Sequence, residues 1–217
     1  MTDNFTPDRD VSADPDVALL ELTAFELITL LSQGQTEAGR RTTELLRLPE
    51  LPQDSPLLGA GLSSLVVRRL ARTEDGALVP IGKLAALSNV LFTADTWVEA
   101  AGITDRENNA ALLIRSPHGS VVVEPRPNGI WQVLPLEPAE PVQVAASRYV
   151  QAAFRTLQGR PFGGSVKVTD AKGARTAAVR VAADDTWQLV HGPADQKLEP
   201  APVRPDPTFR ILAEAVA

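Results

Sequence analysis

The sequence contains a weak internal repeat, in which an amphipathic helix leads into a series of short β-strands that ends in Trp-Gln followed by apolar residues. The first copy spans about residues 79–136 and the second spans 141–191, with the tryptophans at Trp131 and Trp187. Repeated supersecondary units bury their apolar faces against each other. We therefore predict two related helix-plus-meander halves, in which Trp131 and Trp187 occupy equivalent places on their last strands.

The strand patterns predict an antiparallel sheet. Asn128 precedes a glycine, which is a strong signal for a tight hairpin between two strands. The runs at 112–114 and 121–123 are apolar without interruption, as expected for strands buried on both faces, whereas 166–168 and 179–181 alternate apolar and charged residues. The fold class predicted is α+β, with antiparallel β-meanders packed against helices and the first half more central than the second.

Helix signals are local and clear at several places. Thr23 and Glu26 fit a capping box at the start of one helix. Ser55 followed by proline predicts the start of another, and Pro80 the start of a third. The strongest helical period covers 142–157, where apolar residues form one stripe and polar residues the opposite face.

Length and composition favour one compact domain. A chain of 217 residues with 44% hydrophobic residues can bury one core, or two small halves fused into one. We predict a single α+β domain over 16–192, with halves at about 16–137 and 138–192. The acidic, proline-punctuated leader 1–15 is expected to be mobile, and 193–217 to be a proline-rich tail with a short terminal helix.

Charge and cysteine content exclude several classes of protein. Residues 1–21 hold six acidic residues and one arginine, so most of the net charge of −6 lies there and the rest of the chain is nearly neutral. The chain has no cysteine, so it has neither disulfides nor thiolate metal ligands. No signal peptide and no apolar run long enough to cross a membrane is present, which predicts a cytoplasmic protein without a membrane partner.

The residues needed for catalysis are sparse. The two histidines, His118 and His191, have no histidine or carboxylate at helical ligand spacing, so a turn residue and a strand-end residue are the favoured interpretations. Glycines 59 and 61 resemble a dinucleotide fingerprint or a nucleophile elbow, but both patterns are incomplete. Small residues there are better explained by close approach of a helix to its neighbour. We predict no catalytic residue, no cofactor and no metal, and hence no enzyme.

A candidate partner-binding stripe lies at the C-terminus. Phe209, Leu212 and Val216 fall at i, i+3 and i+7, so a helix there would present one apolar stripe. The stripe is expected to dock on the chain's own body, on a protein partner, or on a second copy, the last giving a homodimer by exchange. A frayed tail that docks nowhere is the alternative.

Two other functions compete with protein binding. Arg68, Arg69, Arg72 and Lys83, followed by a hairpin, permit a DNA-binding regulator with a winged-helix segment. A nearly neutral body lacks the basic footprint of duplex binding, so nucleic acid is disfavoured as a partner. A small enzyme of unknown class is the third alternative.

The order of the predicted elements over residues 17–192 carries a family resemblance. It consists of a strand, a capped helix, a Leu-Pro loop, a helix with Ala60-Gly61-Leu62, a turn at 76–78, a helix from Pro80 and a Trp-terminated meander. In this order the chain resembles the EspG family, the cytosolic chaperones of type VII secretion in actinobacteria. The resemblance implies a mixed α+β body with pseudo-two-fold halves, and a non-enzymatic chaperone that binds the apolar tip of secreted PE-PPE protein pairs. No residue matches a family binding position.

Overall fold

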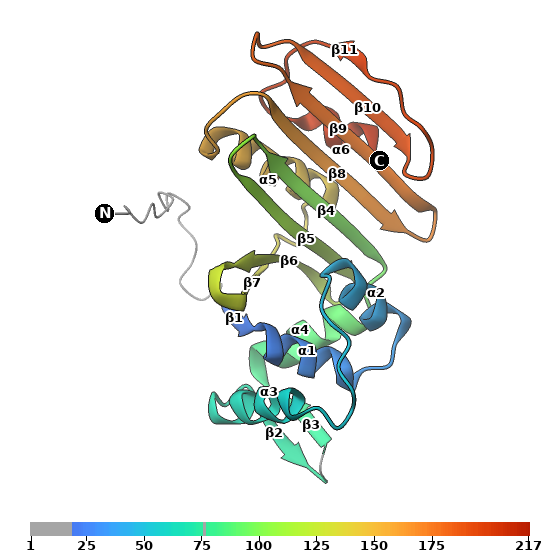
Figure 1. The fold of residues 1–217 in the computed structure, drawn as a ribbon. Helices are drawn as coiled ribbons and strands as arrows, with labels where there is room; N and C mark the ends of the chain where they lie inside the picture. Colours follow the sequence, from blue (N-terminus) through green and yellow to red (C-terminus); the bar gives the residue numbers. More distant parts are fainter. Residues whose placement is uncertain (1–18, 76) are drawn as a thin grey trace, which may run out of the picture.

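The computed structural model describes residues 19–75 and 77–217, so the predicted mobile leader 1–15 lies outside the described residues. Within them the main feature is a nine-stranded antiparallel sheet in the order β1-β7-β6-β5-β4-β8-β9-β10-β11 (Figure 1). Its strands are β1 Leu20–Thr23, β4 Thr96–Ile103, β5 Asn108–Ser116, β6 Gly119–Arg126, β7 Ile130–Pro135, β8 Phe162–Asp170, β9 Gly173–Val181, β10 Trp187–Pro193 and β11 Ala201–Val203. A separate hairpin pairs β2 Ala71–Glu74 with β3 Ala77–Pro80. The predicted α+β class with antiparallel meanders is confirmed.

The α-helices divide between the two faces of the sheet. They are α1 Ala24–Gln33, α2 Glu37–Leu45, α3 Pro56–Val67, α4 Gly82–Phe92, α5 Val142–Thr156 and α6 Arg210–Ala215, with a 3-10 turn at Pro127–Gly129. Figure 1 shows α1 to α4 gathered at the β1 end of the sheet, while α5 and α6 lie behind β4, β8 and β9. Two hydrophobic cores follow from this division, one on each face.

The central strands contribute to both cores. On β5, Leu112 and Ile114 pack in the core with α1 to α4, whereas Leu113 between them packs in the core with α5 and α6. All three are at most 4% exposed, as their unbroken apolar run predicts. On β8, Lys167 lies between buried valines and is only half-buried, so the alternating strands leave one face to solvent as predicted.

Local sequence signals position most of the elements correctly. Thr23 Oγ1 accepts from the Glu26 N–H and the Glu26 carboxylate accepts from the Thr23 N–H, which confirms the capping box. Asn128 adopts φ 65° and the following glycine φ 71°, the left-handed pair that a tight hairpin between β6 and β7 requires. One boundary is corrected: Pro80 ends β3 by pairing with Ala71, and α4 begins only at Gly82.

The two halves repeat the same order of helix and strands, but the two tryptophans do not occupy equivalent places in them. From the β4–β8 pair the strands run outward in chain order, as β4-β5-β6-β7 on one side and β8-β9-β10-β11 on the other, and β1 is added beyond β7. Each of these halves follows a helix, α4 or α5. Trp131, however, lies on the fourth strand after its helix and packs in the core with α1 to α4, whereas Trp187 lies on the third and packs with α5 and α6. The predicted equivalence of the two tryptophans is therefore wrong. A large aromatic residue fits many half-buried strand positions, so its recurrence does not identify equivalent strands.

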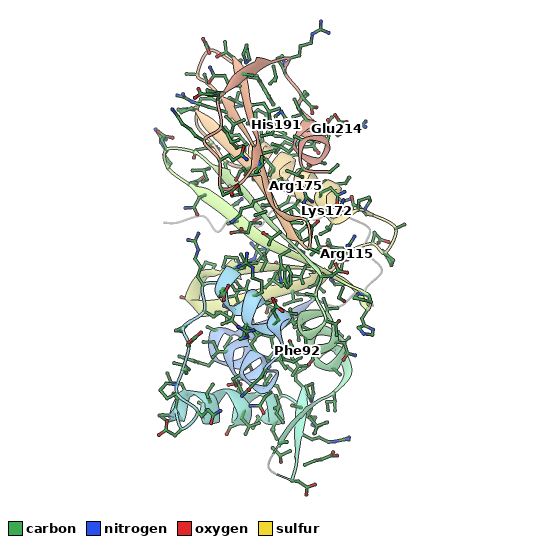
Figure 2. The ribbon with its side chains drawn as sticks, turned by 90° about the vertical axis from the view of Figure 1, so that its right-hand side faces the viewer. Phe92, Arg115, Lys172, Arg175, His191 and Glu214 are labelled. Atoms are coloured by element: carbon green, nitrogen blue, oxygen red, sulfur yellow. The ribbon has the colours of Figure 1, made fainter. Side chains whose placement is uncertain are left out.

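The C-terminal residues belong to the folded body, which corrects the expected tail. β11 extends the sheet by pairing with β10, and α6 packs on β9 and α5. Arg175 on β9 donates from Nε to the Val216 carbonyl at 3.2 Å, and Figure 2 shows Arg175 close to α6, on which Glu214 is labelled.

The predicted stripe is part of the core. Phe209, Leu212 and Val216 are 0%, 0% and 1% exposed, so they do not form a partner-binding surface, and the chain's own body is the docking site. Phe154, Phe162 and Trp187 supply the aromatic surroundings that the sequence pattern alone did not place beside the stripe. An exchange dimer through this stripe has no support in the fold.

Candidate functional site

Helix α3 is the most unusual element on the surface. Ser55 caps it by accepting from the Leu57 N–H, Pro56 occupies its first turn, and no charged residue occurs from Pro56 to Val67. A helix that is apolar on all sides is normally buried. In α3 only Gly61 and Leu65 are buried, and Val67 is 81% exposed.

The inner side of α3 is held tightly on α1. Gly61 lies so close to the Phe25 carbonyl and to the Thr29 hydroxyl that a Cβ atom there would clash with both. Thr29 Oγ1 also donates to the Leu58 carbonyl at 3.2 Å. The expectation that small residues let this helix approach a neighbour closely is confirmed at Gly61, whereas Gly59 faces open space.

A buried carboxylate fixes the C-terminal half of α3. Glu26 on α1 is 0% exposed and accepts from Ser64 Oγ and from Arg68 Nη1, each at 2.7 Å, and from the Thr23 N–H at 2.8 Å. Burial alone would raise the pKa of Glu26, but these hydrogen bonds and the Arg68 charge outweigh it and hold the pKa below 4.5. The orientation of α3, and hence of its outer side, is therefore set by a charged anchor.

The outer side of α3 forms a continuous uncharged surface, which we call the α3 surface. Leu57 and Val66 are 39% and 37% exposed at its margins. Phe25 on α1, whose main chain contacts Gly61, is 43% exposed beside it. The α3 surface consists of Pro56, Leu57, Gly59, Ala60, Ser63, Val66 and Val67. Apart from the Ser63 hydroxyl it offers only apolar groups, so it is suited to binding and carries no titratable group or metal ligand.

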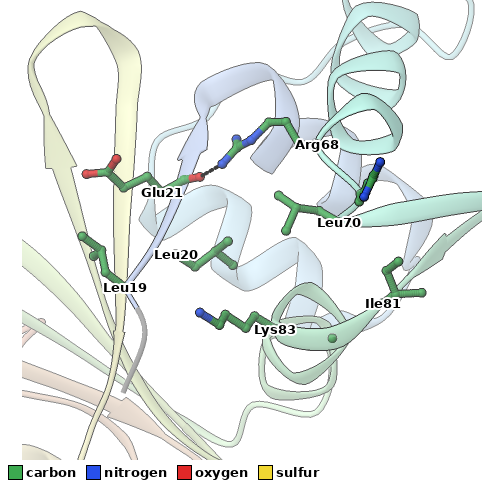
Figure 3. Close-up of a pocket in the computed structure, with 9 residues that line it drawn as sticks. Leu19, Leu20, Glu21, Arg68, Leu70, Ile81 and Lys83 are labelled. Atoms are coloured by element: carbon green, nitrogen blue, oxygen red, sulfur yellow. Dashed lines mark hydrogen bonds between the residues drawn. The ribbon is translucent and has the colours of Figure 1, made fainter. Parts of the chain in front are cut away.

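A pocket of about 510 Å³ opens at the C-terminal end of α3 (Figure 3). Its walls come from β1, from the segment after α3 and from the start of α4, and its cationic residues are Arg68, Arg69 and Lys83. Arg68 Nη2 donates to the Glu21 carbonyl at 2.8 Å, drawn as a dashed line in Figure 3, while its other nitrogen binds Glu26. Arg68 therefore has a structural role here, which removes one cation from the set on which the DNA-binding alternative depends.

The other candidate residues are not brought together. His118 lies in the turn between β5 and β6 and His191 on β10, both exposed. Among residues 19–75 and 77–217, no group of three or more His, Cys, Asp or Glu side chains is arranged to hold a metal ion. A second groove of about 410 Å³ is lined by residues of α5 and of α6. The buried hydroxyl of Ser147 beside it has no hydrogen-bond partner within the described part of the chain.

Sequence reasoning found α3 but missed its exposed side. The apolar spacing of Leu58, Leu62, Leu65, Val66 and Leu70 predicts an inner side. The four leucines do face the body, but the prediction is wrong for Val66, which is 37% exposed on the outer side. No sequence signal identified the exposed side, because the remaining positions of α3 carry no charge and a helix without charges is normally buried.

A scan with protein-family models finds no match for this chain, and a search of curated proteins finds none. None of the helices in the described part of the chain is both long and apolar enough to cross a membrane.

Proposed function

We propose that this chain is a non-enzymatic, cytoplasmic binding protein of the chaperone type, which holds an apolar segment of another protein on the α3 surface. The observation that carries the proposal is the exposure of Val67 and its neighbours on a helix without charges. Contiguous exposed apolar patches on soluble domains mark interaction sites. The resemblance to EspG chaperones supports the same mode of action, with the apolar tip of a secreted protein as the client.

The surface fits an apolar helical segment better than a polar peptide. Residues Gly59, Ala60 and Ser63 are small, so a second helix could approach α3 closely along its middle. Full burial of an exposed Val or Leu side chain contributes about 1.5–3 kcal/mol. Val67, 81% exposed, could supply most of such a contribution, and Leu57, 39% exposed, a smaller part. The Glu26–Arg68 anchor keeps the docking helix in place, so little ordering is needed on binding.

A photo-crosslinking amino acid at Val67 tests the proposal in the native host. Val144 on α5 is 40% exposed and lies away from the α3 surface, so it provides the matched control position. We expect Val67, and not Val144, to crosslink to a defined protein other than a second copy of this chain, through one of that protein's apolar segments. Binding of that purified protein should then weaken at least tenfold for Val67→Glu and stay unchanged for Val144→Glu.

Two results would contradict the proposal. Equal crosslinking at both positions would show that the α3 surface has no special affinity for a client. Salt-dependent binding to generic duplex DNA, abolished by reversing the charges of Arg69 and Lys83, would favour the DNA-binding alternative instead.

A further inference from the structure

The ends of α3 carry opposite charges. Asp54 lies two residues before its first residue and Arg69 lies two residues after its last, and both are exposed. Neither side chain forms an ion pair with any residue in 19–75 or 77–217. The chain is therefore acidic just before the α3 surface and basic just after it, where Arg69 also lines the pocket of about 510 Å³.

This arrangement is complementary to itself in one orientation only. In an antiparallel pair of α3 helices, a two-fold axis between Ala60 and Ser63 brings Asp54 to the level of Arg69 of the second copy, and the reverse. A parallel pair would place Asp54 against Asp54 and Arg69 against Arg69, which repel. Charge therefore selects the antiparallel orientation.

The distribution of small and large side chains along α3 is also compatible with this two-fold axis. The small residues Gly59, Ala60 and Ser63 lie at the middle of the pair, where the two helices come closest. A Cβ atom at Gly59 would have no neighbour within 4 Å, so that position is open to a second helix. The larger side chains lie at the two ends, where Leu57 of one copy reaches the level of Val66 and Val67 of the other.

We propose that two copies of this chain associate through an antiparallel pairing of their α3 surfaces. The pairing uses the same surface as the proposed function but does not depend on a client. It buries apolar side chains that would otherwise remain in water, and two Asp54–Arg69 ion pairs define its register. A client and a second copy then compete for one surface, so the dimer is the form of the protein without its client.

Charge reversal at the two ends tests this arrangement, with the mass of the purified full-length protein measured by sedimentation velocity over a range of concentrations. Asp54→Arg or Arg69→Asp turns two attractive pairs into two repulsive ones, so each should weaken the dimer about tenfold. Aspartate is among the residues that tolerate the left-handed conformation of Arg69, φ 58°. The double variant should restore the wild-type dimer, and Lys197→Asp, a charge change at a side chain 91% exposed on the other half, should have no effect.

Each outcome has a definite meaning. A wild-type protein that is monomeric at every concentration overturns the dimer, and a client crosslink at Val67 in that case leaves the proposed function standing. A dimer that survives Val67→Glu, or single reversals that the double variant does not rescue, overturns the antiparallel α3 pairing. Rescue by the double variant supports it, because simple loss of folding could not be repaired by a second change.

Discussion

Phe209 provides the sharpest test of how the C-terminal segment is held. Its side chain is 0% exposed, and its ring centroid lies 5.1 Å from that of Phe154 and 5.2 Å from that of Trp187. Its main chain is left-handed, with φ 56°, at the position just before α6. The residue therefore combines a fully buried aromatic side chain with a left-handed backbone conformation, which is strained for every residue that has a Cβ atom.

These two properties predict different results for two substitutions. Phe209→Ala should lower the free energy of unfolding by about 3–5 kcal/mol, through lost transfer energy and the cavity left behind. Glycine normally costs about 0.5–1 kcal/mol more than alanine, because of its greater backbone freedom in the unfolded chain. At Phe209 glycine also relieves about 1–2 kcal/mol of left-handed strain that alanine retains. We therefore expect Phe209→Gly to be no less stable than Phe209→Ala.

Urea denaturation followed by tryptophan fluorescence gives both values, since Trp187 lies beside the substituted residue. Phe25→Ala is the control, because Phe25 is 43% exposed and should cost at most about half as much. If Phe209→Ala does not fold, Phe209→Leu keeps part of the buried volume and should still be destabilised. A loss below about 1 kcal/mol for Phe209→Ala would refute the docking of this segment.

Three further predictions concern the packing of α5, the packing of α3 and the anchor of α3. Leu157→Ala should lower the free energy of unfolding by about 2–5 kcal/mol in the same assay, because Leu157 is 9% exposed in the core with α5, and an effect within error would contradict that packing. Gly61→Ala should lower the melting temperature because its Cβ would meet α1, whereas Gly59→Ala should leave the temperature unchanged or raise it; equal effects would mean that α3 does not pack as described. Glu26→Gln should be less stable than the wild type near neutral pH. Because the folded-state pKa of Glu26 is lowered, its contribution is present above its ordinary value of 4.5 and is lost as the pH falls through the folded pKa. The difference between the urea denaturation midpoints of the wild type and Glu26→Gln should thus disappear at acidic pH. A difference that does not change with pH would show that the charge of Glu26 does not stabilise the fold.

Much of the local structure could be predicted from the sequence, because its causes lie within a few residues. The Thr23–Glu26 capping box needs only two side chains three residues apart. The burial of Leu112 to Ile114 on both faces and the half-exposed Lys167 follow from the two-residue period of a strand. The sequence likewise determined that Ser55 caps the start of α3 and that Leu58, Leu62 and Leu65 face inward.

Only the tertiary structure decided which surfaces meet. The stripe of Phe209, Leu212 and Val216 looked available, and it is buried because Phe154, Phe162 and Trp187 come together from distant parts of the chain to receive it. The order of strands in the sheet likewise separated the two tryptophans that the sequence had paired.

The candidate site likewise depends partly on the sequence and partly on the tertiary structure. The sequence determined that α3 is uncharged, but an uncharged helix is normally interior, so its composition alone predicts burial. Its exposure arises because α1 covers the side that contains Gly61 and Leu65, whereas Val67 on the outer side remains 81% exposed. Periodicity reports which residues share a side of a helix, whereas the arrangement of all the elements decides which of those sides remains in water.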